Sequence, residues 1–373
     1  MSKSIHIVAL DIPYPLDYGG AIDMFYRIKA LHELGYKITL HCFEYGRGKQ
    51  SELEKYSDNI IYYPRKKSVL DWLSKTPFIV KSRSSETLLA NLLKDNSPIL
   101  FEGIHCTAHL NNPKLKDSIK FVRCHNIEHD YYNSLAKRAK GLKRLFYSSE
   151  AKKLRAYESK LSEATALLAI QKKDLDHFKG INPNTVLLPA SLPELEIKNN
   201  IQTEDFGLFH GNLSVSENDA AATWIVENVI SKIADFDFRI AGKNPSDTLI
   251  ELCEKHKVKL ITSPSHEEMS HLISTAKVHV QYTDQPTGLK LKLLNALLSN
   301  GAVIANSVMV YGSGLDEHCT ITDSPKAFID AIAVARKSEQ TKAIQKRRNA
   351  ILAQFNTLNN CKVIEELIQK EVT

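Results

Sequence analysis

Two lysines stand at the start of a predicted helix, a position that suits an anionic ligand. In the stretch "TGLKLKLLNALLSN", Gly288 ends a loop, and Lys290 and Lys292 open a helix expected over residues 289–299. A helix N-terminus is the positive end of the macrodipole and favours acidic side chains. A diphosphate held between the two ammonium groups and the free N–H groups explains this placement, and a solvated helix face is the alternative. Asn295, on the same helix, is expected to point away from its apolar stripe.

A second candidate for anion binding follows the first strand of the second half of the chain. The stretch "FGLFHGNLSVSENDAAATW" runs from a strand into Gly211 and Asn212 and then into a helix expected from residue 218. Free backbone N–H groups and a helix N-terminus bind phosphate or sugar oxygens. An ordinary β-turn before a helix capped at Ser216 is the alternative.

In the first half of the chain, polar residues follow a buried strand. The stretch "KFVRCHNIEHDYY" places His125, Asn126 and Glu128 directly after it. Ligands of α/β proteins bind at the carboxyl ends of the strands, and histidine titrates near neutral pH. These residues are therefore candidates for polar contacts and proton transfer, with Asn126 and Glu128 expected to contact the acceptor or line a pocket, although a purely structural histidine is the alternative. No Walker loop, G-x-G-x-x-G motif, zinc-ligand spacing or Ser-His-Asp order is visible, and no metal or cofactor is expected.

A glycine pair separates the first strand from the first helix. In "PYPLDYGGAID", Gly19 and Gly20 permit a positive φ or a close approach by another group. That group is either a ligand or a neighbouring segment in a tight turn.

Short β-branched runs alternate with amphipathic segments along the whole chain, a pattern typical of βαβ units with a parallel sheet. The pattern predicts an α/β fold of two doubly wound, Rossmann-like domains facing a cleft. The first domain covers residues 1–190, residues 191–205 form a linker, residues 206–355 form the second domain, and a C-terminal helix (356–373) joins the first. Strands are expected at 5–11, 37–43, 60–63, 99–102, 120–124, 165–169, 185–188, 206–210, 236–241, 258–261, 278–282, 302–305 and 319–321.

Composition is that of a fully folded globular protein, because 43% of the 373 residues are hydrophobic and 25% are charged. The six cysteines are scattered, which fits reduced thiols in a cytoplasmic protein. No export signal and no apolar run of membrane-spanning length is visible.

One stretch concentrates the positive charge. Residues 134–161, expected to be helical, carry a net charge of +7, more than the +6 of the whole chain. This basic helix is either a solvated face or a contact with anionic lipids at the inner face of the membrane. A nucleic-acid partner is not expected, because aromatic residues are few and no recognition module is apparent.

Taken in order, the motifs resemble those of the GT-B glycosyltransferases, specifically the retaining family four, which uses nucleotide-sugar donors. The matching stretches are "PYPLDYGGAIDMFYRIKALHELGYKITL", "RCHNIEHDYY", "EAKKLRAYESKLSEATALLAIQKKDLDHF", "FHGNLSVSENDAAATWIVENVI" with "FRIAGKNP", and "TGLKLKLLNALLSNGAVIAN". The resemblance implies a glycine-pair loop near the donor phosphates, a catalytic histidine lining the donor-sugar pocket, and a diphosphate neutralised by lysines. The residues concerned are Gly19, Gly20, His125, Gly211, Asn212, Gly288, Lys290, Lys292 and Asn295.

The resemblance implies a hexosyltransferase that acts on a glycan or lipid-linked acceptor in the synthesis of a surface polysaccharide or glycoconjugate. Many relatives carry two glutamates in the last motif, the second contacting the donor ribose, whereas here Asn295 and Thr287 stand in their places. A neutral amide is a weaker acceptor than a carboxylate. The alternatives are a GT-B relative that binds a nucleotide or a partner without catalysis, and a nucleotide-sugar epimerase.

Overall fold

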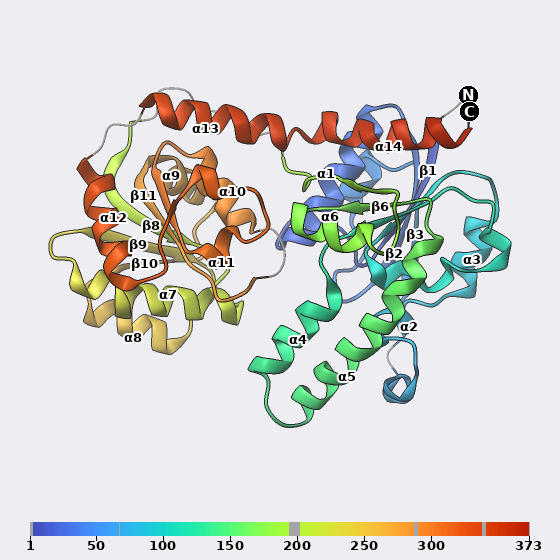
Figure 1. Ribbon diagram of the computed structural model, residues 1–373, viewed down its shortest axis with the longest axis horizontal. Coiled ribbons are helices and arrows are strands. Elements are labelled where there is room, and N and C mark those ends of the chain that lie inside the picture. The colour runs from blue at the N-terminus through green and yellow to red at the C-terminus, as the bar shows by residue number, and fades with distance from the viewer. Residues whose placement is uncertain (1–2, 67, 194–201, 287–289, 338–340, 373) are drawn as a thin grey trace. The chain divides into compact units, whose positions relative to one another are not determined.

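The protein is described from a computed structural model that covers residues 3–66, 68–193, 202–286, 290–337 and 341–372. Its contacts divide the chain into two compact units. Unit 1 holds the described residues up to 193 and those from 355 onward, and unit 2 holds those from 202 to 354. Figure 1 shows the elements of both units, and each unit is described by itself.

Unit 1 is built on a seven-stranded sheet in the order β3-β2-β1-β4-β5-β6-β7, and every pairing is parallel. Parallel sheets are covered by helices on both faces, which is why these strands are apolar runs rather than alternating ones. The strands are β1 (Ser4–Ala9), β2 (Lys37–Glu44), β3 (Asn59–Pro64), β4 (Ile99–Glu102), β5 (Lys120–Cys124), β6 (Ala166–Ala169) and β7 (Thr185–Leu187).

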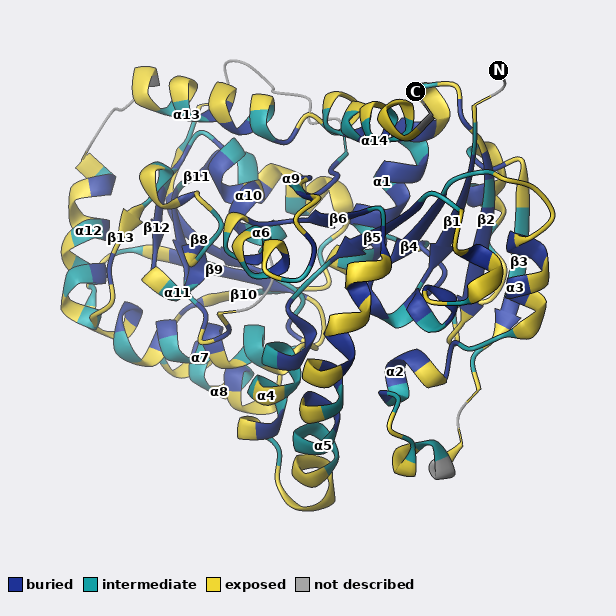
Figure 2. Cartoon of the chain, turned by 45° about the vertical axis from the view of Figure 1, so that its right-hand side comes forward, coloured by how far each residue is buried: buried dark blue, intermediate teal, exposed yellow. Residues whose placement is uncertain are grey.

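Two apolar cores cover the two faces of this sheet, and Figure 2 shows that its strands are largely buried. One contains Leu154 and Phe178 from its helices, and the other contains Ile28 together with Cys361 and Ile364 from the C-terminal helix. The end of the chain therefore packs into unit 1. The helices are α1 (Gly19–Glu33), α2 (Phe78–Lys81), α3 (Glu86–Leu92), α4 (Glu128–Arg138), α5 (Gly141–Tyr157), α6 (Lys172–Lys179) and α14 (Thr357–Val372).

Unit 2 repeats the design with a six-stranded parallel sheet in the order β10-β9-β8-β11-β12-β13. The strands are β8 (Glu204–His210), β9 (Asp237–Gly242), β10 (Lys259–Thr262), β11 (Ala276–Gln281), β12 (Ala302–Ala305) and β13 (Thr320–Ile321). The helices are α7 (Ser216–Asn228), α8 (Asp247–Lys255), α9 (His266–Thr275), α10 (Leu291–Leu298), α11 (Ser307–Val310), α12 (Pro325–Lys337) and α13 (Thr341–Gln354).

Helix α13 is tied to the end of α10 by one arginine. The Arg347 guanidinium donates hydrogen bonds to the carbonyl oxygens of Leu297 (2.8 Å) and Ser299 (2.9 Å), where α10 ends. The last carbonyl groups of a helix have no partner within it, and a cation there also opposes the negative end of the dipole. Arg347 thus fixes α10, the helix that carries the predicted lysines.

The predicted fold class is confirmed, and each of the thirteen predicted strands overlaps an observed one. The alternation of short β-branched runs with helical segments was enough to predict the strands. Both sheets are buried on two faces, so their strands are continuous apolar runs that stand out in the sequence. Strand β8 begins at Glu204, two residues earlier than predicted. Residues 194–201 of the predicted linker lie outside the described residues.

Two expectations about local structure are wrong. Gly19 and Gly20 open helix α1 instead of forming a loop, and neither has a positive φ. A Cβ on Gly20 would lie 2.7 Å from the Tyr18 ring, so the tyrosine is what approaches this glycine closely.

The predicted basic helix (134–161) is in fact the end of α4, helix α5 and a following 3-10 turn. Ala139 and Lys140 are extended, and Gly141 has φ +58°. These three residues end α4 and reverse the chain. Glycine adopts this left-handed conformation without the penalty that a side chain brings.

Candidate functional site

The carboxyl edge of the unit 2 sheet brings two glycines into contact. The Gly211 N–H donates to the Ala241 carbonyl (3.0 Å), so the chain after β8 runs against the end of β9. A Cβ on Gly242 would lie 2.0 Å from the Gly211 carbonyl oxygen. Such a distance is far below van der Waals contact, so only glycine fits at 242. Gly242 thereby sets the position of the Gly211 loop.

The predicted donor-side residues of this unit converge on Asn218, in the first turn of α7. Its side-chain amide donates to the Asn212 carbonyl (3.0 Å), and its Oδ1 accepts from Lys292 Nζ (2.8 Å). Lys290 Nζ lies 3.6 Å from a Glu217 carboxylate oxygen. The loop after β8, the start of α7 and the start of α10 therefore meet at one place. Asn218, which the sequence analysis did not single out, connects them.

Lys292 is a half-buried cation without a carboxylate partner among the described residues. Its ammonium lies 4.7 Å from the centre of the Phe209 ring, a cation-π contact, and otherwise donates to an amide oxygen. Burial, and then repulsion by Lys290, lower its pKa to about 7. A bound anion would favour the charged form and reverse this shift.

Beside Lys292, the ends of two neighbouring strands bury polar groups that lack partners. Both ring nitrogens of His210, at the end of β8, and both amide atoms of Gln281, at the end of β11, have no hydrogen bond in the described chain. His210 is 4% exposed and Gln281 is fully buried. Burial, with a further effect from Lys292, lowers the pKa of His210 to about 3, so its ring is neutral.

Unsatisfied buried polar atoms cost about 1–3 kcal/mol each, so a cluster of them calls for an explanation such as a ligand. The sequence contains a signal for Gln281, since a polar residue ends the apolar strand "KVHVQ", but the sequence analysis did not include it. His210 gave no separate signal, because it stands between an apolar strand and a glycine turn. The cluster lies at the sheet edge where α/β folds bind ligands.

In unit 1, His125 follows β5 and faces two buried carboxylates. Its Nε2 lies 3.1 Å from Glu102 Oε2, and its Nδ1 lies 3.8 Å from Asp23 Oδ2. An ionised carboxylate only accepts hydrogen bonds, so Nε2 carries a proton. The side chain of His125 is 10% exposed. Both carboxylates were missed at the sequence level.

These carboxylates belong to a buried network of charges. The Arg27 guanidinium contacts both Asp23 (2.7 Å) and Glu102 (2.9 Å), and Arg123 donates to Asp23 at 3.1 Å. Burial would raise the pKa of Asp23, but Arg123 and Arg27 outweigh it and hold that pKa well below its usual range. The network therefore fixes His125 through charges from α1, β4 and β5.

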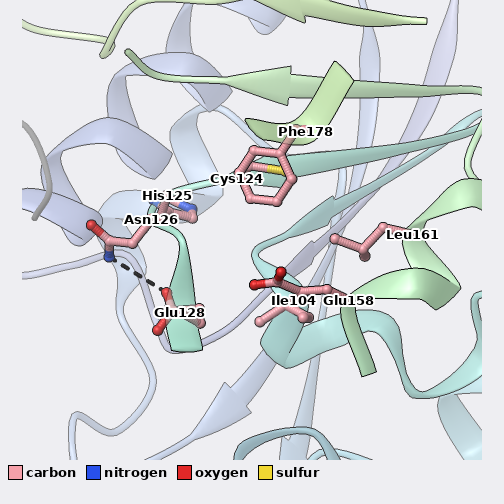
Figure 3. A pocket seen from close by; sticks show the side chains of 8 residues that line it. All are labelled: Ile104, Cys124, His125, Asn126, Glu128, Glu158, Leu161 and Phe178. Atoms are coloured by element: carbon pink, nitrogen blue, oxygen red, sulfur yellow. Dashed lines mark hydrogen bonds between the residues drawn. The ribbon is translucent and has the colours of Figure 1, made fainter. Parts of the chain in front are cut away.

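A small pocket, partly open to solvent, lies beside His125 (Figure 3). Asn126 and Glu128, both predicted as pocket or acceptor residues, line it, and Asn126 Nδ2 lies 3.4 Å from Glu128 Oε1. Burial raises the pKa of Glu128 to about 7. A buried carboxyl that changes charge near neutral pH can serve as a general acid or base.

Glu158, on the opposite side of this pocket, joins two histidines. It accepts from His129 Nδ1 (2.8 Å) and lies 3.1 Å from His177 Nε2. These three residues have the ligand types that a divalent metal uses, as do Asp23, Glu102 and His125. In the first group the two histidines bond to Glu158, and in the second His125 bonds to Glu102 while Arg27 pairs with both carboxylates.

The remaining predicted residues lie elsewhere on helices α10 and α1 or outside the described residues. Asn295 is exposed on α10, whose buried face is formed by Leu293, Leu294, Ala296 and Leu297. Gly288 and Thr287 lie outside the described residues. Gly19 and Gly20 open α1 in unit 1. The cleft between the two domains stays a prediction.

Comparisons with known proteins show which proteins this chain resembles. No family model matches the chain. It is 28% identical over 340 residues to an uncharacterized 44.6 kDa protein of a cps region in Klebsiella pneumoniae, covering 84% of this chain and 85% of that protein.

Three solved structures resemble the chain over nearly its full length. TarM is 12% identical, with a TM-score of 0.69, and the match covers 98% of this chain and 99% of TarM. A glycosyltransferase from Rickettsia africae is 15% identical, with a TM-score of 0.64 and the same coverage. HepE from Anabaena, in complex with UDP and glucose, is 11% identical, with a TM-score of 0.65, and the match covers 99% and 100%.

The chain has the GT-B fold. The expected fold is thereby confirmed, since these neighbours are glycosyltransferases of the GT-B type. Within this GT-B chain, unit 2 carries the lysines, His210 and Gln281 at its sheet edge, and unit 1 carries the charge network around His125.

Proposed function

We propose that this GT-B protein is a glycosyltransferase that takes a hexose from a nucleoside diphosphate sugar. The proposal depends mainly on the edge of the unit 2 sheet, where the half-buried Lys292 lies near His210. His210 and Gln281, at the ends of the neighbouring strands β8 and β11, have buried polar atoms without partners in the described chain. Such a site offers hydrogen bonds to hydroxyl or phosphate oxygens and one positive charge. HepE, which shares the fold, is described in complex with UDP and glucose, and this supports a nucleotide-sugar donor.

The chemistry of transfer fits these groups. Departure of a nucleoside diphosphate builds negative charge on its β-phosphate. A fixed cation lowers the barrier because it stabilises this charge more in the transition state than in the bound substrate. Lys292, with Lys290 next to it at the start of α10, is the proposed source of that charge. The N–H groups at the start of α7 and the Gly211–Asn212 loop add dipoles of the same sign.

For unit 1, we propose His125 as the catalytic candidate, with Asn126 and Glu128 contacting the acceptor or lining its pocket. The protonated Nε2 is held by Glu102, so this ring is oriented rather than free to rotate. Retention of configuration is proposed from the resemblance to the retaining family alone.

The acceptor is proposed to be a glycan or a lipid-linked glycan in the synthesis of a surface polysaccharide. The relative from a cps region supports this assignment. Work at the cytoplasmic face of the membrane is part of the same proposal.

Calorimetric titration with nucleoside diphosphates and their sugars tests the donor site. We expect at least one nucleoside diphosphate to bind, and Lys292→Met to weaken its binding at least tenfold. Lys255→Met, which removes an exposed lysine at the end of α8, is the matched control and should bind as the unmodified protein does. If no nucleoside diphosphate binds, the proposal is wrong.

A second candidate function is a GT-B protein that binds a nucleotide sugar without transferring it. Asn295, a neutral and exposed residue at the place of an acidic one, favours this candidate. Mass spectrometry of the reaction with a matched acceptor separates the two: binding without transfer or donor hydrolysis supports the second candidate, and a glycosylated product supports the first.

A further inference from the structure

Helices α4 and α5 form an antiparallel hairpin that projects from unit 1. Figures 1 and 2 show its tip extending away from the sheet, and the tip residues are exposed. The base of the hairpin is anchored, because Ala151, Leu154 and Tyr157 of α5 are buried. A projecting pair of helices held only at its base buries little apolar surface near its tip. The tip therefore contributes little to the stability of the unit 1 core.

The tip carries large apolar side chains in water. Leu142 is 75% exposed and Leu145 is 61% exposed. Residues three apart lie on the same face of a helix, so the two leucines form one apolar surface. Single exposed leucines are common on proteins, but a pair at the end of a projecting hairpin marks an interaction site.

A second segment, distant in sequence, adds to this surface. The turn Val69–Leu73 packs against α5: the Trp72 ring lies 6.0 Å from the Phe146 ring, and Lys153 Nζ donates to the Trp72 carbonyl (2.6 Å). Leu73, next to this anchor, is 84% exposed. The turn and the hairpin tip project to the same side of unit 1 in both views (Figures 1 and 2).

Basic side chains surround these leucines. Residues 137–145 contain Lys137, Arg138, Lys140, Lys143 and Arg144 and no acidic residue, and all five are exposed. Within the described chain, no carboxylate pairs with Lys140, Lys143 or Arg144. Unpaired cations beside exposed apolar side chains match an interface that is anionic at its surface and apolar a few ångströms below it.

We propose that the α4–α5 tip (residues 137–145), together with Leu73, is a docking surface for a membrane containing anionic lipids. The leucines would insert at the boundary between headgroups and acyl chains, and the lysines and arginine would lie among the headgroups. No helix in the described part of the chain is long and apolar enough to cross a bilayer. Docking of this kind deepens the proposed function, since it would bring unit 1 to a lipid-linked acceptor, and that link depends on the proposed transferase activity.

Flotation of the full-length protein with liposomes tests the surface without donor or acceptor. We expect binding to vesicles of phosphatidylcholine that contain about a third phosphatidylglycerol, an anionic lipid. Binding to phosphatidylcholine alone should be much weaker. Each basic residue near such a surface strengthens binding about fivefold, so the triple variant Lys140→Gln, Lys143→Gln, Arg144→Gln should bind roughly a hundredfold more weakly. The pair Leu142→Ser, Leu145→Ser should lose at least tenfold.

The matched control removes the same charge elsewhere in unit 1. Lys94→Gln, Lys114→Gln and Lys116→Gln change three exposed lysines outside the hairpin, and this variant should bind within about threefold of the unmodified protein because only total charge is altered. If tip and control variants lose binding equally, or if the leucine pair has no effect, the proposal is overturned. Far-UV circular dichroism checks that each variant is folded.

A protein partner for the same surface is a different outcome. Loss of self-association in the leucine variant, measured by analytical ultracentrifugation, together with no flotation of the unmodified protein, would overturn the membrane assignment. Because flotation needs no nucleotide, vesicle binding that persists in a protein without transfer activity would contradict the proposed function alone.

Discussion

Replacing Asp23 with asparagine tests whether the buried charge network holds unit 1 together. Asp23 is 3% exposed and accepts hydrogen bonds from Arg27, from Arg123 and from the Ser191 N–H (2.6 Å). In Asp23→Asn, Arg27 keeps Glu102 as a carboxylate partner, Arg123 keeps only the carbonyl groups of Leu188 and Pro189, and the new amide N–H groups face cations. Breaking a buried ion pair by removing one partner costs about 3–5 kcal/mol.

For a unit of this size, that loss corresponds to a fall in Tm of roughly 6–20 °C. Asp17→Asn is the matched control, because Asp17 pairs with Arg47 at the surface and its side chain is 41% exposed. Exposed pairs contribute about 0–1 kcal/mol, so the control should melt within a few degrees of the unmodified protein.

The same network predicts how the difference depends on pH. Since the pKa of Asp23 is lower in the folded protein than in the unfolded chain, its stabilising effect is complete above the unfolded value, about 3.9, and is lost as pH falls below it. The gap between Asp23→Asn and the unmodified protein should therefore be constant from pH 5 to 7 and should narrow below pH 4.

Calorimetric melting gives the overall loss, and hydrogen exchange with mass spectrometry assigns it to a unit. Peptides from β4 and β5 should exchange faster in Asp23→Asn, whereas peptides from β8 and β9, in unit 2, serve as the internal reference. A difference below 1 kcal/mol at pH 7, or equal acceleration in both units, would refute the role given to this network.

Three further predictions concern both units. Nucleoside diphosphate affinity should fall by up to tenfold per pH unit above about pH 7, because the Lys292 amine must take up a proton to pair with the phosphates; calorimetry from pH 6 to 9 measures this, and a flat profile argues against Lys292. Gly242→Ala should displace the Gly211 loop, cost about 1–3 kcal/mol and weaken nucleotide binding. Gly314→Ala is the control: nothing lies within 4 Å of its new methyl group but the backbone has φ +73°, so it should lose about 1–2 kcal/mol of stability and leave nucleotide binding unchanged. Glu128→Gln should be more stable than the unmodified protein by about 3 kcal/mol at pH 8 and equal to it near pH 4, because the raised pKa of Glu128 costs stability as pH rises from about 4.5 to 7; urea unfolding at the two pH values decides.

The sequence by itself determined the fold class. Strand and helix periods are local properties of the chain, so runs such as "KFVRC" and "FGLFH" identified the strands that β5 and β8 became. The order of residues along the chain also placed Gly211, Asn212 and Lys292 near a strand end or a helix start. In the structure, Asn212 and Lys292 both hydrogen-bond to Asn218.

Tertiary structure alone decided which charges meet. Asp23, Glu102 and Arg123 are separated by 79 and 21 positions of sequence, and they become neighbours only because β4 lies between β1 and β5 in the sheet. From the sequence alone, a carboxylate in a helix is expected to face solvent. Only the order of the strands shows which residues pack against it. The break between α4 and α5 has a similar cause: at Ala139 and Lys140 the helical pattern continues, and only the backbone at Gly141 reveals the reversal that exposes Leu142 and Leu145.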